Sequence, residues 1–291
     1  MEPWQARSSE FHPYSVDRLE EMPQELQDLA RAALPTGALL RAAFVVPEED
    51  REGKPEAAQA LLFTQTGVVR VALSEAPLQI DAATLLWLRS SHLLLQGCIE
   101  LMAAVEGQQI RLEMAFNAIG WRLIQPAWQA LVGQAIGRER GGAHPPFSAD
   151  QLAGVPEKFV DGLERYGLYT GEALVGAVFQ PALWSSGRLA GDEQQLHNTL
   201  VVLTDASVLL LEEEKALVRR SEQLGLIITR IPLRVVEQVV EVPCAAHWQL
   251  EFVLTSGGCT DRCSVSLAAE ALRRWALLWP LRSQPEQGEG R

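Results

Sequence analysis

Cysteine, long uncharged apolar runs and basic residues are all scarce in this sequence. Its 291 residues include four cysteines, which are too few for a framework of disulfides. The most apolar window, residues 85–105, is interrupted by Arg89, His92 and Glu100. A membrane-spanning helix needs about 20 nearly uncharged residues. We therefore expect no membrane span and no disulfide scaffold.

The shortage of basic residues bears on partners and location. Acidic residues outnumber basic ones 37 to 25, and the formal net charge is -12. Such a charge repels nucleic acid and anionic lipid surfaces, so we expect no nucleic-acid partner. The N-terminus has no basic stretch followed by an apolar run, and this predicts a cytoplasmic protein without a signal peptide.

The strongest pattern that is present is an internal repeat. Residues from Asp17 onward match residues from Asp150 onward, at an offset of 133. The offset then rises through 134, 140 and 145 to 151, where Trp128 matches Trp279. An offset that only increases is expected when one copy has longer loops between unchanged elements, because loop insertions cost little free energy. We therefore predict a duplication. A chain of 291 residues with 47% hydrophobic residues is long and apolar enough to form two domains, each with its own core.

Composition indicates where the two copies begin and end. Residues 134–149 are rich in Gly and Pro and show little periodicity, which is typical of a linker. We predict a first unit over residues 17–133 and a second over residues 150–282. Residues 1–16 and the tail 283–291 lack a core-forming pattern and are predicted to be mobile.

Each unit is predicted to contain a short leading helix followed by strands. Pro23 and Pro156 occupy plausible first helical positions, and apolar residues then recur at helical spacing. In the second unit the period changes to two and predicts seven strands. These strands are residues 173–179, 195–203, 207–212, 225–231, 235–242, 248–255 and 260–266.

The last two strands of each unit are predicted to form a hairpin. Two-residue turns at Glu106-Gly107 and Gly257-Gly258 set the register. The predicted pairs are Ala103 with Ile110, Leu101 with Leu112, Ile99 with Met114, Leu254 with Asp261, Phe252 with Cys263, Leu250 with Val265, and Trp248 with Leu267. Because a slip of one residue would turn the apolar side chains outward, agreement in both copies supports these turns.

An amphipathic helix closes each unit and is expected to cover the open end of a small curved sheet. Its stripe contains Trp121, Ile124, Trp128 and Leu131 in the first unit, and Leu272, Trp275, Trp279 and Arg282 in the second. Pro126 is expected to kink or shorten the first of these helices.

Seven strands in two nearly orthogonal sheets, closed by a Trp-bearing helix, resemble the pleckstrin-homology-type split barrel, including its bacterial and GRAM-like relatives. The residues that carry this resemblance are Val201–Asp205, Val208–Leu211, Thr229–Arg234, the last hairpin, Trp275 and Trp279. The resemblance implies a mainly β fold with capping helices (α+β). It implies two tandem PH-like split barrels, each with a leading helix and a C-terminal amphipathic helix. It also implies an interaction module.

The resemblance does not extend to the usual lipid site. Relatives that bind phosphoinositides carry several Lys and Arg around the first inter-strand loop, where these residues hold phosphates. The corresponding loops here are residues 48–54, which are mostly acidic, and residues 184–193, which contain one cation. We therefore expect no phosphoinositide at the usual PH site.

Catalytic and metal chemistries find little support. Cys244, His247, Cys259 and Cys263 have the composition of a zinc site, but the predicted hairpin places His247 and Cys259 about 20 Å or more apart. The histidines have no nucleophile or carboxylate at motif spacing, and no hydrolase, metalloprotease or nucleotide-binding fingerprint occurs. We therefore expect no catalytic residue, no metal and no cofactor.

Four residues are candidates for binding. Arg89 and Arg234 match across the copies at offset 145, and each follows an apolar residue at the predicted end of a strand. A repeated arginine is a candidate for an anion site, and the alternative is a surface or ion-paired arginine. Trp128 and Trp279 are candidates because the closing helices are expected contact surfaces.

Together these patterns predict a cytoplasmic, non-enzymatic interaction or scaffold protein. Its duplicated PH-like domains would bind a protein partner or self-associate, through exposed strand edges and the closing helices. The alternative is a small-molecule or lipid binder that uses the barrel mouth or the cleft between the domains. An enzyme without a recognisable motif is the third hypothesis.

Overall fold

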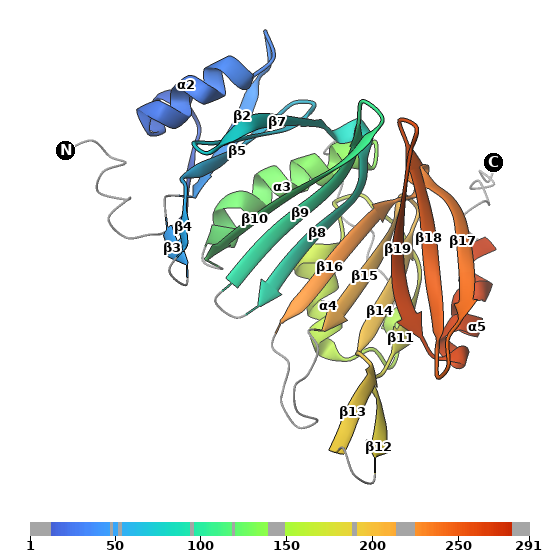
Figure 1. Ribbon diagram of the computed structural model, residues 1–291. Helices are drawn as coiled ribbons and strands as arrows, with labels where there is room; N and C mark the ends of the chain where they lie inside the picture. Colours follow the sequence, from blue (N-terminus) through green and yellow to red (C-terminus); the bar gives the residue numbers. More distant parts are fainter. Residues whose placement is uncertain are drawn as a thin grey trace, which may run out of the picture.

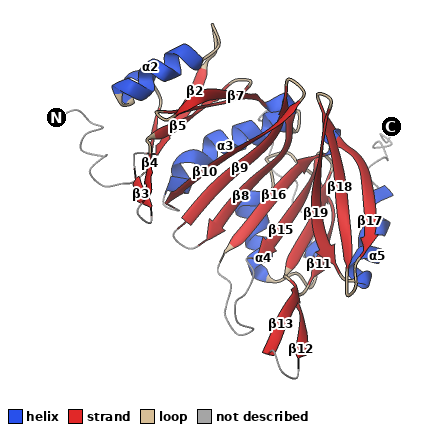
Figure 2. Cartoon of the chain, in the orientation of Figure 1, coloured by secondary structure: helices blue, strands red, loops and turns tan. Residues whose placement is uncertain are grey.

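The chain folds into antiparallel sheets with helices packed on them, as the computed structural model shows in Figures 1 and 2. The mainly β fold class with accompanying helices is therefore confirmed. The structure describes residues 13–46, 49–51, 54–93, 96–117, 120–138, 149–187, 191–213 and 225–280.

The first half of the chain begins with a short strand and a helix and ends with a longer helix. Its elements are β1 (Tyr14–Val16), η1 (Leu19–Glu21), α2 (Gln24–Ala33), β2 (Leu40–Val46), β3 (Glu49–Arg51), β4 (Lys54–Glu56), β5 (Gln59–Thr64), β6 (Gly67–Ala72), β7 (Glu75–Asp81), η2 (Ala82–Thr84), β8 (Leu85–Leu93), β9 (Gln96–Val105), β10 (Gln108–Asn117) and α3 (Trp121–Ala135).

From η1 onward the order of elements in the first half recurs in the second, with an added π-helical turn and a shorter closing helix. Its elements are η4 (Ala149–Leu152), α4 (Glu157–Gly162), the π-helical turn η5 (Leu163–Gly167), β11 (Leu174–Gln180), β12 (Leu183–Gly187), β13 (Gly191–Leu196), β14 (Thr199–Thr204), β15 (Ser207–Glu213), β16 (Leu226–Pro232), η6 (Leu233–Val235), β17 (Val236–Pro243), β18 (Trp248–Ser256), β19 (Cys259–Leu267) and α5 (Ala269–Leu278).

The strands of the second half repeat the bounds of the first. β11 follows β2 at an offset of 134, β14 follows β5 at 140, and β16 follows β7 at 151. The predicted offset of 145 is wrong. The rise from 140 to 151 occurs in one step. β15 is one residue longer than β6, and the connection from β15 to β16 is 10 residues longer than that from β6 to β7.

Both predicted hairpin registers are confirmed, pair by pair. The turn residues have positive φ values, 51° and 78° at Glu106 and Gly107, and 52° and 81° at Gly257 and Gly258. Two successive left-handed residues suit the tight turn that joins twisted antiparallel strands. The register buries Leu250, Phe252 and Leu254 completely on the inner face of β18.

One sheet crosses from the first half into the second. Its strand order is β10-β9-β8-β16-β15-β14-β11, and β8 pairs with β16 in antiparallel register from Leu88 opposite Arg230 to His92 opposite Leu226. Two smaller sheets, ordered β1-β2-β5-β6-β7 and β17-β18-β19, lie on either side of it (Figure 1). The halves therefore share backbone hydrogen bonds, which satisfy two strand edges that would otherwise be open.

Each half has an inner core between its sheets and an outer core beneath its leading helix. α3 closes the first inner core with Trp121, Ile124, Trp128 and Leu131, and α5 contributes Leu272 and Trp275 to the second, as the apolar stripes predict. Single side chains also cross the junction. Tyr169 of the second half packs in the first inner core, and Trp87 of the first half packs in the second.

Several boundaries differ from the sequence-based prediction. The sequence predicts a mobile N-terminus over residues 1–16, but residues 14–16 form β1, whose Tyr14 and Val16 are buried against the sheet. α3 continues through Pro126 and ends at Ala135, so this proline does not shorten it, and the helix enters the predicted linker 134–149. Residues 139–148 of that linker, residues 1–12 and the tail 283–291 lie outside the described residues.

The two loops that correspond to the lipid-binding loop of PH domains, residues 48–54 and 184–193, contain hairpins. β3 pairs with β4 within residues 48–54 and just beyond, and β12 pairs with β13 across residues 184–193. Alternation is weak in these segments because charged and small residues dominate them, so a period of two does not reveal the strands. Most of their side chains lie outside the described residues, and the expectation of no phosphoinositide there stays a prediction.

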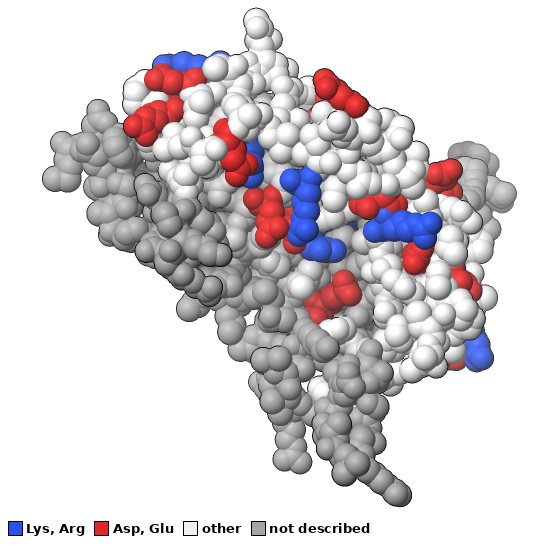
Figure 3. Space-filling model, in the orientation of Figure 1, with Lys and Arg blue, Asp and Glu red and all other residues white. Residues whose placement is uncertain are grey.

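The described surface mixes charges of both signs. Acidic and basic side chains lie next to one another across the face seen in Figure 3. Arg111, for example, contacts Glu100 at 2.7 Å and Glu113 at 3.2 Å. Among the described residues, no helix combines the length and the apolar character that crossing a bilayer requires.

Candidate functional site

Arg89 lies within β8, where this strand pairs with β16 of the second half. Its Nε donates a hydrogen bond to Thr229 Oγ1 at 2.9 Å. Its guanidinium also lies 3.7 Å from a carboxylate oxygen of Glu100 and 4.9 Å from the ring centre of Trp87. These contacts favour the ion-paired alternative over an anion site, and they place Arg89 in the junction between the halves.

Arg234 lies in η6 and reaches into the first half. Its Nε donates to the carbonyl of Ala135 at 2.6 Å, and its two Nη atoms donate to the carbonyls of Ala83 and Ala82 at 2.6 and 2.8 Å. Burial lowers the pKa of Arg234, and the nearby charge of Asp81 opposes that shift. All three nitrogens of this guanidinium are thus occupied by the backbone of the other half.

The two arginines do not occupy equivalent positions. Arg89 is a strand residue, whereas Arg234 lies in a 3-10 turn, and the offset of 151 pairs Arg234 with Ala83. Their predicted match is a consequence of the wrong offset. Both residues nevertheless act at the same place, because each bonds across the junction that β8 and β16 form.

An aromatic stack completes the junction. The ring of His92 lies 4.3 Å from that of Tyr166 in a stacked arrangement and 4.4 Å from that of Trp121 in an edge-on arrangement. Burial lowers the pKa of His92 to about 4, so the imidazole is neutral at neutral pH. His92 therefore serves here as a neutral ring that packs between two aromatic rings, with its Nε2 within hydrogen-bond distance of Ser90 Oγ at 3.3 Å.

The two candidate tryptophans differ in what they can contact. Trp128 is 3% exposed and packs in the inner core of the first half, so its predicted binding role is corrected to a packing role. Trp279 follows α5 and is partly buried, with its ring 5.5 Å from that of Trp275 and 6.1 Å from that of Phe252. It covers the second inner core.

The second half contains a buried ion pair. Both carboxylate oxygens of Glu172 lie 2.7 Å from Nη1 of Arg230, and Glu172 also accepts hydrogen bonds from Thr204, Ser207 and the backbone N–H of Tyr169. Burial alone would raise the pKa of Glu172, but Arg230 and these hydrogen bonds hold it below its usual value. The side chain of Glu172 is fully buried, so its carboxylate has a structural role and cannot contact a ligand.

The cysteines show no arrangement for metal binding. Cys259 and Cys263 are buried in the inner core of the second half, while Cys244 is exposed. Burial raises the pKa of the Cys263 thiol to about 12, so it stays protonated at neutral pH. Within the described ranges, no three His, Cys, Asp or Glu residues gather where they could hold a metal ion.

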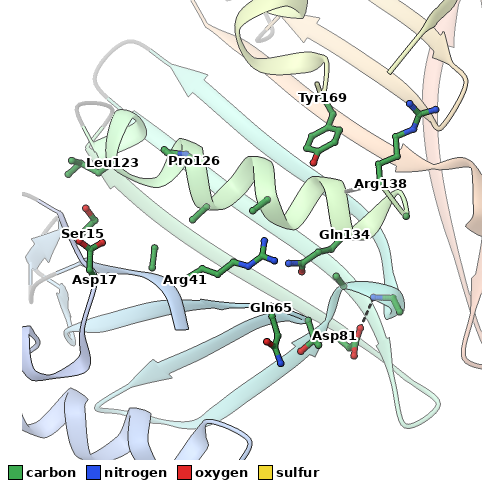
Figure 4. A pocket seen from close by; sticks show the side chains of 17 residues that line it. Ser15, Asp17, Arg41, Gln65, Asp81, Leu123, Pro126, Gln134, Arg138 and Tyr169 are labelled. Atoms are coloured by element: carbon green, nitrogen blue, oxygen red, sulfur yellow. Dashed lines mark hydrogen bonds between the residues drawn. The ribbon is translucent and has the colours of Figure 1, made fainter. Parts of the chain in front are cut away.

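A cleft of about 1120 Å³ lies beside the junction, between α3 and the edge of the first sheet (Figure 4). One wall is the face of α3 that carries Leu123, Pro126, Ala127 and Ala130, at helical spacing. The opposite wall is polar and comes from β1, β2, the turn between β5 and β6, and the adjacent end of β7. Its residues are Ser15, Asp17, Arg41, Gln65, Thr66 and Asp81.

The far end of the cleft is formed where the halves meet. Tyr169 and Arg138 lie there, with Gln134 at the last turn of α3 (Figure 4). Arg138 is engaged by the carboxylate of Asp205 and by the carbonyl of Gly171. Gln134 donates to the carbonyl of Thr64 at 3.3 Å, while its Oε1 is buried without a hydrogen-bond partner among the described residues.

None of the residues that line this cleft stands out as a binding residue in the sequence. They come from β1, β2, two turns, α3 and the start of the second half, and no short motif joins such distant positions. The sequence does contain one indication of the cleft. On α3 a second apolar stripe, made of Leu123, Ala127 and Ala130, lies beside the stripe that packs in the core, so the apolar face of this helix is wider than packing in the core requires.

Comparison of the chain with models of known protein families gave no match, and comparison with curated proteins gave none either.

Proposed function

We propose that this protein is a non-enzymatic interaction module, built from two PH-like split barrels, that binds a segment of a protein partner in the cleft beside α3. The observation that carries the proposal is the cleft itself, with one apolar and one polar wall. An extended peptide presents side chains of both kinds on opposite sides, so it can satisfy both walls at once.

The size of the cleft favours a peptide over a small molecule. Its volume of about 1120 Å³ exceeds the roughly 300–1,000 Å³ that is usual for small-molecule pockets. Leu123, 41% exposed on the apolar wall, would be covered by such a partner. A small molecule or lipid in this cleft is the alternative ligand.

The rigid junction supports the same proposal. Because β8 and β16 share one sheet and Arg234 bonds three carbonyls of the first half, the end of the cleft at Tyr169 is held against α3. A preformed site loses less conformational entropy when it binds, which favours affinity.

A comparison of matched variants tests the proposal. Leu123→Glu places a charge on the apolar wall, and Leu277→Glu makes the same change on α5 at a leucine that is 75% exposed and outside the cleft. Each protein is immobilised and exposed to lysate of the native cell, and retained proteins are identified and then titrated individually. A Thr66→Trp variant fills the cleft from the opposite, exposed wall.

We expect a partner that wild type and Leu277→Glu retain and that both cleft variants lose, with all four proteins equally folded by circular dichroism. Retention of every partner by the cleft variants would refute the cleft as the site. Recovery of a bound metabolite that the cleft variants lose, in place of a protein, would favour the small-molecule alternative.

A further inference from the structure

One guanidinium of the cleft has no partner among the residues that the structure describes. Arg41 projects from β2 into the cleft toward Gln134 (Figure 4). It is exposed, and no hydrogen bond or ion pair joins it to any residue that the structure describes. The other cleft arginine, Arg138, is already bound to Asp205 and Gly171. Arg41 is therefore the cation available to a ligand.

The carboxylates of the cleft do not neutralise Arg41. Asp81 accepts the backbone N–H of Ala83 at 2.7 Å, which caps η2, and its charge lies close enough to Arg234 to affect the pKa of that arginine. Asp17 lies beside Ser15 at the end of the cleft from which the guanidinium of Arg41 points away (Figure 4). An anionic group near Gln134 would thus meet Arg41 first.

Gln134, toward which Arg41 points in Figure 4, has an acceptor to which no described residue donates. Gln134 Oε1 is buried and has no partner among the described residues. A buried acceptor without a hydrogen bond is unfavourable, so a small shift of the Gln134 side chain toward the cleft would let a peptide N–H satisfy it. A peptide that presents a carboxylate side chain to Arg41 places its own backbone N–H groups within the same region of the cleft.

From this charge complementarity we propose that the cleft selects a peptide segment with an acidic side chain that pairs with Arg41, flanked by apolar side chains that pack on α3. This inference rests on the proposed function and adds the chemistry of the partner. An arginine fork binds a carboxylate through two parallel hydrogen bonds, so an Asp or Glu at one position of the peptide would set its register in the cleft.

A phage-displayed library of random linear peptides tests this inference, because it samples acidic and acid-free sequences in the same selection. The library is selected in parallel on wild type, on Arg41→Gln and on Arg273→Gln, which removes the same charge from an exposed position on α5 outside the cleft. We expect wild type and Arg273→Gln to enrich peptides with one recurrent Asp or Glu among apolar residues. Arg41→Gln is expected to lose the acidic preference and keep the apolar one.

The best peptide is then titrated with its Glu→Gln or Asp→Asn analogue against wild type and Arg41→Gln. We expect each single change to weaken binding about tenfold and the double change to add little more, because both remove the same charged hydrogen bond. Enrichment of acid-free peptides, or additive losses, would refute the acidic preference and leave peptide binding intact. Failure of every protein to enrich peptides would refute the proposed function as well.

Discussion

At the scale of single residues, the ion pair of Glu172 and Arg230 is the most consequential polar feature outside the cleft. The first half has no equivalent, since Ala38 and Gln79 occupy the matching positions at offsets of 134 and 151. The network is therefore specific to the second half, where it joins β16 to the segment that leads from η5 into β11.

We predict that Glu172→Gln lowers the free energy of unfolding by about 3–5 kcal/mol, because it leaves Arg230 as a buried charge without its counterion. Urea unfolding at neutral pH measures the loss. The double variant Glu172→Gln with Arg230→Met should recover part of it, since no unpaired charge then remains. A loss below about 1 kcal/mol would show that the pair is not desolvated in solution.

The same pair predicts a pH dependence. The folded-state pKa of Glu172 lies below its ordinary value of 4.5, so the stabilisation is complete above that value and is lost as the pH falls through the folded-state pKa. Below pH 4.5, wild type should lose stability toward the level of Glu172→Gln, and the curves for the two proteins should converge. Parallel curves over this range would contradict the assignment.

At the scale of the secondary-structure elements, the strands that pair at the internal junction differ in composition from the strands at the open sheet edges. The segments of β8 and β16 that pair contain neither proline nor a carboxylate. Their counterparts at an offset of 151, β17 and β7, lie at sheet edges and contain Glu237, Glu241 and Pro243 in one strand and Glu75, Pro77 and Asp81 in the other. Proline and charge on an edge prevent strand addition, so these two edges are poor sites for self-association.

We predict that removing this protection produces oligomers. We consider a variant with Glu75→Thr and Pro77→Ile on β7, together with Glu237→Thr and Glu241→Val on β17. Because β7 is the counterpart of β16 and β17 that of β8, the β7 edge of one molecule should pair with the β17 edge of the next, as β16 pairs with β8 within each molecule. The variant should therefore associate head to tail. Light scattering over a range of protein concentrations measures the mass. Wild type and the control Glu270→Thr on α5 should stay monomeric, and an unchanged mass for the edge variant would refute this role of the edge residues.

How much the sequence could predict also differs between elements. Period-two alternation and the turn residues predicted both hairpin registers and seven strand segments in the second half, but they missed the hairpin of β12 and β13. The equivalence of Arg89 and Arg234 failed because a single long connection, between β15 and β16, moved the offset in one step. Arg41 had no signal at all, because its importance depends on α3 lying opposite β2, and no local pattern encodes that contact.

At the scale of the whole molecule, the shared sheet predicts that the two halves unfold together. The β8–β16 pairing, Arg89, Arg234 and the exchange of Tyr169 and Trp87 between cores all link them. We expect a single calorimetric transition for wild type. Arg89→Ala combined with Arg234→Ala, which removes four hydrogen bonds across the junction, should separate it into two. Two transitions in wild type would show that the halves are independent domains.

The central claim is that a partner segment binds between α3 and the polar wall opposite it. Hydrogen–deuterium exchange, measured with and without the selected peptide, tests this claim most directly because it reports the bound region without a mutation. We predict slower exchange in residues 40–42, 64–67 and 121–137, with β7 and β17 unchanged. Protection confined to β7, β17 or α5, with no change along α3, would contradict it.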